Sequence, residues 1–205
     1  MIIFPHKNQK KNFQDFTTNY FMTLNESCKK INLKKLSTIL SEVLKIIVKK
    51  KNIYIAGNGG SGSIANHFVC DFNKSILISS NRRLKPRFFS LSSSPEMITA
   101  IGNDISADKI FSSQLEMLAQ KGDALFAMSC SGNSKNINEA IKFAKKKGLI
   151  IFYICGFKKK NTHKLKYFIN LDCQNYGITE DIFTSILHII SQFIRFKFST
   201  KKEIL

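Results

Sequence analysis

The sequence predicts an α/β protein built on a parallel β-sheet, and three observations lead to this prediction. Residues 52–56 read as a buried strand that opens into a glycine-rich turn and then a helix. Residues 124–134 repeat that order with a serine-rich turn. Residues 149–155 form an uninterrupted apolar run, which is typical of a strand buried on both faces of a parallel sheet.

Length and charge narrow the class of protein. With 205 residues the chain fits one domain, which would bury roughly 70% of the surface that the unfolded chain exposes. The formal net charge of +18 comes from lysines scattered through most polar segments. We interpret them as solvated surface rather than as a dedicated polyanion site, so no nucleic-acid partner is expected. A basic exterior would still speed the capture of an anionic substrate.

Cysteine usage points to a reducing compartment. The five cysteines form no C-x-x-C pair and no paired framework, which is typical of a cytoplasmic protein. The first residues lack the apolar core and cleavage site of a signal peptide. No run of about 18 apolar residues is present, so no membrane span is expected.

Two helices are predicted within residues 8–50, ahead of the first strand. Apolar residues recur at helical spacing over residues 13–24 and again over residues 36–48. We expect residues 1–50 to be an N-terminal helical extension of a domain over residues 51–205, the whole forming a single structural domain. We expect the apolar stripes of these helices to pack against another subunit, which would serve oligomerisation. For the second helix the alternative is that its stripe packs against its own domain.

The glycine-rich turn after the first strand predicts an anion site. Gly57, Gly59 and Gly62 match the dinucleotide fingerprint, and a helix over residues 63–73 follows. Glycines let backbone N–H groups approach a ligand, and the helix N-terminus adds a partial positive charge. The acidic residue needed about 20 positions later for a ribose contact is absent, because residues 79–83 carry none. A phosphate is the ligand that this turn favours.

The helix over residues 63–73 carries two polar side chains of catalytic type. His67 and Asp71 are four residues apart and therefore share a face, displaced from the apolar stripe of the helix. They either point into the same cleft or form a solvated surface pair.

Between the two turns the sequence predicts a strand over residues 87–91, a helix opened by Pro95 and a further helix over residues 111–118. Residues 101–104 interrupt the apolar pattern, so a turn is expected there. Asp104 is either a turn former or cap, or a ligand contact.

The second turn is rich in hydroxyl groups. A strand over residues 124–128 ends at Ser129, and Ser131 and Ser134 follow before a helix over residues 137–147. The serines are either helix caps or phosphate ligands, and three hydroxyls in six residues exceed what one cap requires. This set suits a single sugar phosphate better than a pyrophosphate. Two such turns in one α/β domain can converge on one ligand.

The last predicted elements are a strand over residues 167–171 and a strongly apolar helix over residues 179–198. Glu180 and His188 on this helix are eight residues apart, slightly more than two turns, so they lie at roughly similar azimuth. His188 stands among apolar residues and is either a core histidine with a hydrogen-bond partner or a site residue.

These motifs together resemble the phosphoheptose isomerases of the sugar isomerase, or SIS, domain superfamily. The motifs that carry the resemblance are residues 57–61, His67, residues 102–104, residues 129–134, Glu180 and His188. The resemblance spans about residues 20–195. It implies a three-layer α/β/α sandwich with a five-stranded parallel sheet, of SIS and flavodoxin-like type. It also implies a homotetramer with active sites at subunit interfaces, which interconverts sedoheptulose 7-phosphate and D-glycero-D-manno-heptose 7-phosphate.

The resemblance assigns roles residue by residue. Substrate binding falls to Asn58, Gly59, Gly60, Ser61, Asn103, Asp104 and Cys130, and the phosphate falls to Ser129, Ser131 and Ser134. His67, Asp71, Glu180 and His188 match a catalytic cluster that binds zinc in some members. Four positions depart from the family pattern: Asp71 replaces Glu, Glu180 replaces Gln, Cys130 replaces a common Thr and Phe183 replaces a frequent His.

The chemistry explains why such a cluster is needed. Aldose-ketose isomerisation moves a proton between C1 and C2 through an enediol, so one base must reach both carbons while an acid or cation steadies the neighbouring oxygens. We assign the base to Glu180 or Asp71 and the acid to His188, with His67 as a metal ligand or positioning group. All four side chains would also satisfy tetrahedral Zn²⁺. Repulsion between the two carboxylates favours a cation between them.

Two rival functions remain beside this one. A non-catalytic SIS protein would keep the phosphate turns and act by binding partners, like the family relative that associates with a bacterial replication initiator. An isomerase for another sugar phosphate is the second rival, because Asp71 and Cys130 depart from the family pattern. The heptose pathway implied by the resemblance supplies surface polysaccharide such as lipopolysaccharide or capsule.

Overall fold

The computed structural model describes residues 2–5, 11–157, 160–161 and 163–199, and it confirms the α/β prediction. Five parallel strands form one sheet in the order β3-β2-β4-β5-β6. The strands are β2 (Ile53–Ala56), β3 (Phe88–Ser90), β4 (Ala124–Ser129), β5 (Ile150–Cys155) and β6 (Tyr167–Asn170). The boundaries of all five strands lie within one residue of the predicted segments. The chain order changes direction between β2 and β4, and ligands of open α/β sheets bind outside the strand ends at such a point.

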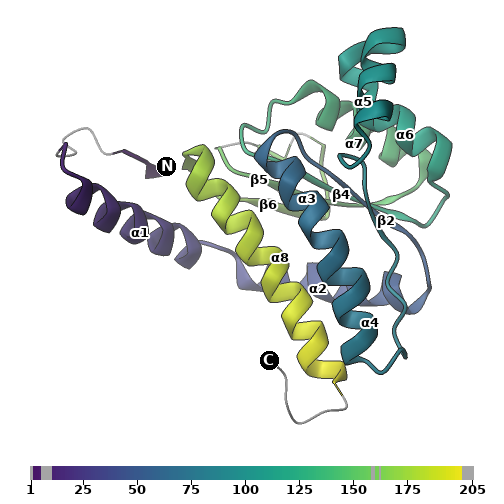
Figure 1. Ribbon diagram of the computed structural model, residues 1–205, viewed down its shortest axis with the longest axis horizontal. Helices are drawn as coiled ribbons and strands as arrows, with labels where there is room; N and C mark the ends of the chain where they lie inside the picture. The colour runs from purple at the N-terminus through teal and green to yellow at the C-terminus, as the bar shows by residue number, and fades with distance from the viewer. Residues whose placement is uncertain (1, 6–10, 158–159, 162, 200–205) are drawn as a thin grey trace.

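Helices cover both faces of the sheet, which makes three layers (Figure 1). One face packs against α2 (Leu33–Val48), α3 (Gly60–Cys70), α4 (Ile76–Ser79) and α8 (Tyr176–Phe198). The other face packs against α6 (Ile110–Leu118) and α7 (Lys135–Lys147). Strand β2 shows why two layers are needed, because Ile53 and Ile55 enter one core while Tyr54 and Ala56 enter the other.

The two N-terminal helices behave differently. Helix α2 belongs to the core of its own domain, since Ile39, Val43 and Ile46 are almost fully buried with the sheet. Helix α1 (Phe13–Lys29) lies along α8, where the Tyr20 hydroxyl donates to Asp181 Oδ2 at 2.6 Å. Phe13 on α1 is 83% exposed. Of the two alternatives for the second helix, packing on its own domain is the one observed.

One predicted helix is too short, and one predicted break in helical structure is wrong. Helix α3 begins at Gly60 and passes through a π-helical turn, Asp71–Ser75, into α4. Helix α5 (Pro95–Ile101) opens with its proline as predicted, but Gly102–Ser106 continue it as a second π-helical turn instead of ending it. Polar turn residues stay helical here because the segment lies at the surface, where Asn103 and Asp104 are exposed.

A short parallel ladder was not predicted. Strand β1 (Ile2–Ile3) pairs with β7 (Cys173–Gln174), just before α8. Two residues per strand are too few for a periodicity signal. Among the described residues no helix is both long and apolar enough to cross a bilayer.

Candidate active site

The glycine-rich turn connects β2 to the N-terminus of α3, as the sequence predicts. Gly59 adopts φ 53°, a left-handed conformation that favours glycine. The chain then turns at once into the helix, with the Gly62 N–H donating to the Gly59 carbonyl at 2.9 Å. The first amides of α3 therefore face the space beyond the sheet.

The group that meets the start of α3 is a carboxylate of the protein itself. The Ser61 hydroxyl donates to Glu180 Oε1 at 3.4 Å, and the Cys130 thiol donates to the same oxygen at 3.6 Å. A Cβ added at Gly60 would overlap the Glu180 carboxylate, so only glycine admits it there. The positive end of the helix dipole favours this negative charge. The structure thus places an internal anion where the sequence predicts a phosphate seat.

Replacement of Gly60 by alanine is expected to displace Glu180 without unfolding the protein. The overlapping atoms are the far end of a flexible side chain, and alanine improves helix propensity by up to about 1 kcal/mol. We expect kcat/KM to fall about tenfold or more while the melting temperature stays near that of the wild type. Gly102→Ala is the control for folding, because its added Cβ meets nothing closer than 3.9 Å. Full activity of Gly60→Ala would show that the position of Glu180 is unimportant.

The serine-rich turn joins β4 to α7 and presents its hydroxyls toward the same space. Ser129 Oγ lies 3.0 Å from Ser134 Oγ and accepts from the Gly132 N–H at 3.0 Å. Ser131 Oγ accepts from the Asn133 N–H at 3.1 Å. Ser134 precedes α7 but makes no side-chain cap. These contacts order the loop and leave the amides at the start of α7 facing outward.

A pair of asparagines fastens the two turns to each other. Asn58 Nδ2 donates to Asn136 Oδ1 at 2.8 Å, and Asn136 Nδ2 donates back to Asn58 Oδ1 at 2.9 Å. Sequence reasoning singled out Asn58 and missed Asn136. Asn136 lies in the first turn of α7, directly after the serine-rich turn. That position is the one sequence signal that would have pointed to this residue.

The two turns converge on one cavity of about 250 Å³, as predicted. Met128 and Tyr176 also line it, and the sequence analysis named neither. The cavity is lined by Asn58, Gly59, Gly60, Ser61, Met128, Ser129, Cys130, Ser131, Ser134, Tyr176 and Glu180.

Cys130 lies in the wall of this cavity as a protonated thiol. Burial raises the pKa of Cys130 to about 12, and the neighbouring Glu180 carboxylate adds to the rise. At neutral pH the thiol is therefore a hydrogen-bond donor rather than a nucleophile.

A second group of catalytic side chains gathers between α3 and α8. His67 Nε2 lies 3.4 Å from His188 Nε2, and Asp71 Oδ2 lies 3.8 Å and 3.5 Å from these two nitrogens. The His188 side chain is 38% exposed and packs its edge against the Phe68 ring. His188 is therefore not a histidine buried in the core, and His67 and Asp71 are not an isolated surface pair, because His188 lies beside both.

These three residues, which we call the His-Asp-His cluster, have the geometry of a metal site. Two nitrogen ligands of a tetrahedral zinc ion, each about 2.0–2.1 Å from the metal, lie about 3.4 Å apart. The ligand atoms of His67, Asp71 and His188 all lie within 4.8 Å of one another. The cluster can thus supply three ligands and leave a fourth position open.

Glu180 lies outside the cluster, which corrects the predicted set of four metal ligands. Eight residues of helix rise about 12 Å between Glu180 and His188, so similar azimuth does not bring their side chains together. The carboxylate of Asp71 belongs to the His-Asp-His cluster, whereas the carboxylate of Glu180 lines the cavity. The expected cation between them is not supported by this arrangement.

Asn103 and Asp104 do not reach the cavity or the cluster within this chain. They lie exposed on the π-helical turn after α5, where Asn103 Nδ2 donates to Asp104 Oδ1 at 2.8 Å. Their predicted contact with the sugar stays a prediction.

The doubly wound sheet with paired phosphate-type turns defines a sugar isomerase domain, and residues 15–156 match the SIS domain family model. The chain is 32% identical over 173 residues to a probable phosphoheptose isomerase of Thermoplasma acidophilum, covering 82% of this chain and 91% of that protein. It is 34% identical over 161 residues to the phosphoheptose isomerase of Fusobacterium nucleatum, covering 77% and 79%. The chain therefore belongs to the phosphoheptose isomerase family, a family of aldose-ketose isomerases.

A solved structure agrees with this placement. The phosphoheptose isomerase of Neisseria gonorrhoeae superposes with a TM-score of 0.79 at 25% identity, over 89% of this chain and 98% of that one. The fold predicted from the family resemblance is thus confirmed.

Proposed function

We propose that this protein converts sedoheptulose 7-phosphate to D-glycero-D-manno-heptose 7-phosphate. The relatives' names support a phosphorylated heptose as substrate, and the family resemblance implies this pair of sugars. The observation that carries the proposal is the arrangement of two groups along α8. The cavity with its serine hydroxyls and Glu180 lies near the first turns of α8, and the His-Asp-His cluster lies about two turns further along, near the middle of the helix. An extended sugar phosphate can then place its phosphate in the serine turn and its carbonyl end near the cluster, with Glu180 accepting hydrogen bonds from hydroxyls between them.

The cluster supplies a base and an acid for the proton transfer. Asp71 takes the proton from C1 of the ketose while His188 protonates the carbonyl oxygen at C2, which gives the enediol. Asp71 then returns the proton to C2, and the O1 proton leaves to His188 as the aldehyde forms. A single carboxylate serves both carbons, as this isomerisation requires. Asp71 is preferred to Glu180 as the base because it lies 3.5 Å from the His188 imidazole.

Zn²⁺ is the proposed cofactor of the cluster. His67, Asp71 and His188 would hold it, each through one ligand atom. The ion would then polarise the C2 carbonyl oxygen in place of a proton from His188, while the second carboxylate oxygen of Asp71 stays available as the base. When bound, the ion would stabilise negative charge on the oxygens at C1 and C2. Glu180 would remain on the substrate in the cavity.

We propose a homotetramer in which residues 1–50 serve assembly as an N-terminal extension of the domain over residues 51–205. Exposed apolar side chains on the outer faces of α1 and α8 support this proposal: Phe13, Phe21, Ile189 and Phe193. Ile189 follows His188 directly, so a partner subunit covering it would close the cluster from solvent. Exposed Asn103 and Asp104 are then available to a neighbouring subunit's site. The proposed setting is the cytoplasm, in heptose synthesis for surface polysaccharide.

The direct test is to incubate the purified protein with sedoheptulose 7-phosphate and follow the sugar by NMR spectroscopy. We expect an aldoheptose 7-phosphate to appear, deuterium from D₂O to enter at the reacting carbon, and a chelator to reduce the rate. Binding without conversion would favour the non-catalytic SIS protein. Conversion of another ketose phosphate in preference would move the proposal to a different sugar.

A further inference from the structure

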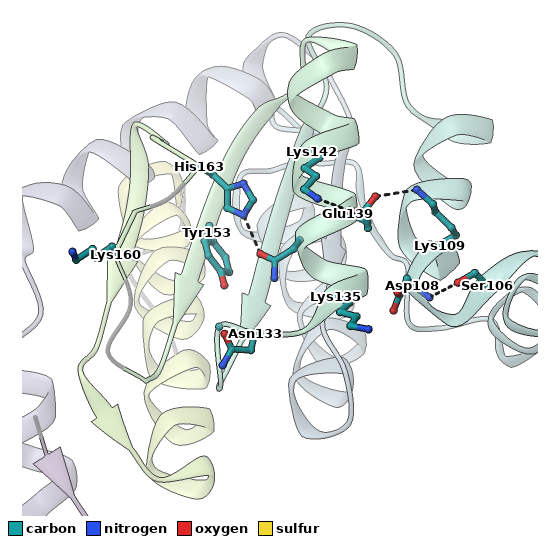
Figure 2. Close-up of a pocket in the computed structure, with 12 residues that line it drawn as sticks. Ser106, Asp108, Lys109, Asn133, Lys135, Glu139, Lys142, Tyr153, Lys160 and His163 are labelled. Carbon is teal, nitrogen blue, oxygen red and sulfur yellow. Dashed lines mark hydrogen bonds and ion pairs between the residues drawn. The ribbon is translucent and has the colours of Figure 1, made fainter.

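A second cavity lies on the other side of the serine turn, over α7. Its volume is about 540 Å³, and Gly132 and Asn133 of the turn form part of its wall. Figure 2 shows α7 between the start of α6 on one side and β5 with its connection to β6 on the other. We call this cavity the α7 groove. It is lined by Ser106, Asp108, Lys109, Gly132, Asn133, Lys135, Asn138, Glu139, Lys142, Tyr153, Lys160 and His163.

The inner end of the α7 groove holds a buried hydroxyl that is only weakly engaged. Tyr153 is only 4% exposed, and its hydroxyl oxygen makes no hydrogen bond of regular geometry among the described residues, although the Ser129 side chain of the serine turn lies close enough to interact with it. The hydroxyl points along the groove toward Asn133 (Figure 2). Burial raises the pKa of Tyr153, so the group stays protonated and available as a donor. A buried polar group of this kind normally has a partner, because leaving it unpaired costs about 1–3 kcal/mol.

The charge of the α7 groove favours an anion. Four lysines line it against two carboxylates. Glu139 accepts hydrogen bonds from Lys142 at 2.7 Å and from Lys109 at 2.9 Å. These partners lower the pKa of Glu139 to about 2, so its carboxylate stays ionised and the two lysines balance its negative charge. The remaining lysines of the lining, Lys135 and Lys160, have no such carboxylate partner within the described part of the chain and come from opposite sides of the groove (Figure 2).

A hydrogen-bond chain connects the α7 groove to the serine turn. His163 Nε2 lies 2.9 Å from Asn138 Oδ1, and Asn138 Nδ2 donates to the Ser134 carbonyl at 3.0 Å. Burial and the neighbouring charges of Lys142 and Lys145 lower the pKa of His163. The neutral ring therefore donates from Nε2 to the amide oxygen and leaves Nδ1 as an acceptor. Any molecule that moves His163 or Asn133 also acts on the turn that holds Ser134.

We propose that the α7 groove is a second binding site, for a small phosphorylated molecule, and that it acts on the substrate site through the shared serine turn. The buried Tyr153 hydroxyl and the lysines supply the donors that a phosphate monoester requires. The binding part of the proposal is independent of the sugar that the enzyme isomerises. The coupling part rests on the proposed function, because it is read from isomerase kinetics.

Binding is tested with inorganic phosphate as the probe and the ¹⁵N signals of the four histidines as the readout. We expect a saturable shift of the His163 signal at constant pH and ionic strength, with sodium chloride as the salt control. Lys135→Gln and Tyr153→Phe should each weaken the affinity reported by His163 about tenfold, the loss expected for a hydrogen bond to a charged group. Lys147→Gln, which removes the same charge from the same helix outside the groove, should leave it unchanged.

Phosphate also competes with substrate at the serine turn, so inhibition kinetics separate the two sites. We expect mixed inhibition in the wild type and purely competitive inhibition in Tyr153→Phe, with the competitive constant and kcat unchanged. A His163 signal that does not respond, or that responds equally in Lys135→Gln, Tyr153→Phe and the wild type, would overturn the site. Purely competitive inhibition in the wild type alongside a saturable His163 shift would overturn the coupling. An inactive protein that still shows the shift would count against the isomerase proposal alone.

Discussion

Asp71→Asn is expected to lower kcat about 10³-fold, within the range that a positioned general base contributes. The amide keeps the shape of the side chain but cannot accept a proton from carbon. KM should change little, because the serine turn that we assign to the phosphate belongs to the cavity, which Asp71 does not line. The measurement is steady-state kinetics together with the rate at which deuterium from D₂O enters the sugar.

The matched variant for this prediction is Asp71→Glu. It keeps the carboxylate, restores the residue usual in the family and should retain much of the activity. Glu180→Gln is the competing test, because Glu180 is the other carboxylate near the substrate. If Glu180→Gln loses deuterium incorporation while Asp71→Asn retains it, the base is Glu180 and our assignment is wrong.

His188→Gln is expected to lower kcat about 10²- to 10³-fold, because an amide cannot deliver a proton to the carbonyl oxygen. His188 also supplies one of three atoms in the His-Asp-His cluster, so zinc affinity should fall with activity. Loss of a supporting group around a metal typically costs 10- to 100-fold in affinity, and loss of a ligand should cost more. Zinc content per chain and kcat are the two measurements.

The wild type treated with a chelator is the reference for this variant. If His188 acts both as acid and as ligand, His188→Gln should be slower than the chelated wild type. Since the His188 side chain is 38% exposed, the substitution is not expected to unfold the protein. Normal turnover in His188→Gln would remove this residue from the mechanism.

Much of the fold follows from local sequence. The five strands are mostly apolar runs bounded by turn residues. The inner strands β2, β4 and β5 are buried on both faces, so their hydrophobicity is visible without any partner. Both turns are also readable, because glycine at Gly59 and hydroxyls at Ser129 and Ser134 are what a tight anion-binding loop needs. The family resemblance extended this reading to His67, Asp71 and His188, which the structure brings together.

Helix interruptions were less predictable. Residues 101–104 look like a turn, yet the chain continues through a π-helical turn. One extra residue per hydrogen-bonded turn absorbs the irregularity, and nothing in residue type announces it. The same applies to the π-helical turn that starts at Asp71, which lies in the cluster itself.

What residue order alone determined is the parallel sheet, the two phosphate-type turns and the identity of the polar side chains at the site. Only the tertiary structure decided which of those side chains line the cavity and which form the His-Asp-His cluster. Glu180 lies at the start of α3 because Gly60 leaves room for its carboxylate, and His188 joins His67 and Asp71 further along α8. Spacing along one helix cannot show this, because the outcome depends on how α8 packs against α3, and contacts between distant segments are set by packing in three dimensions.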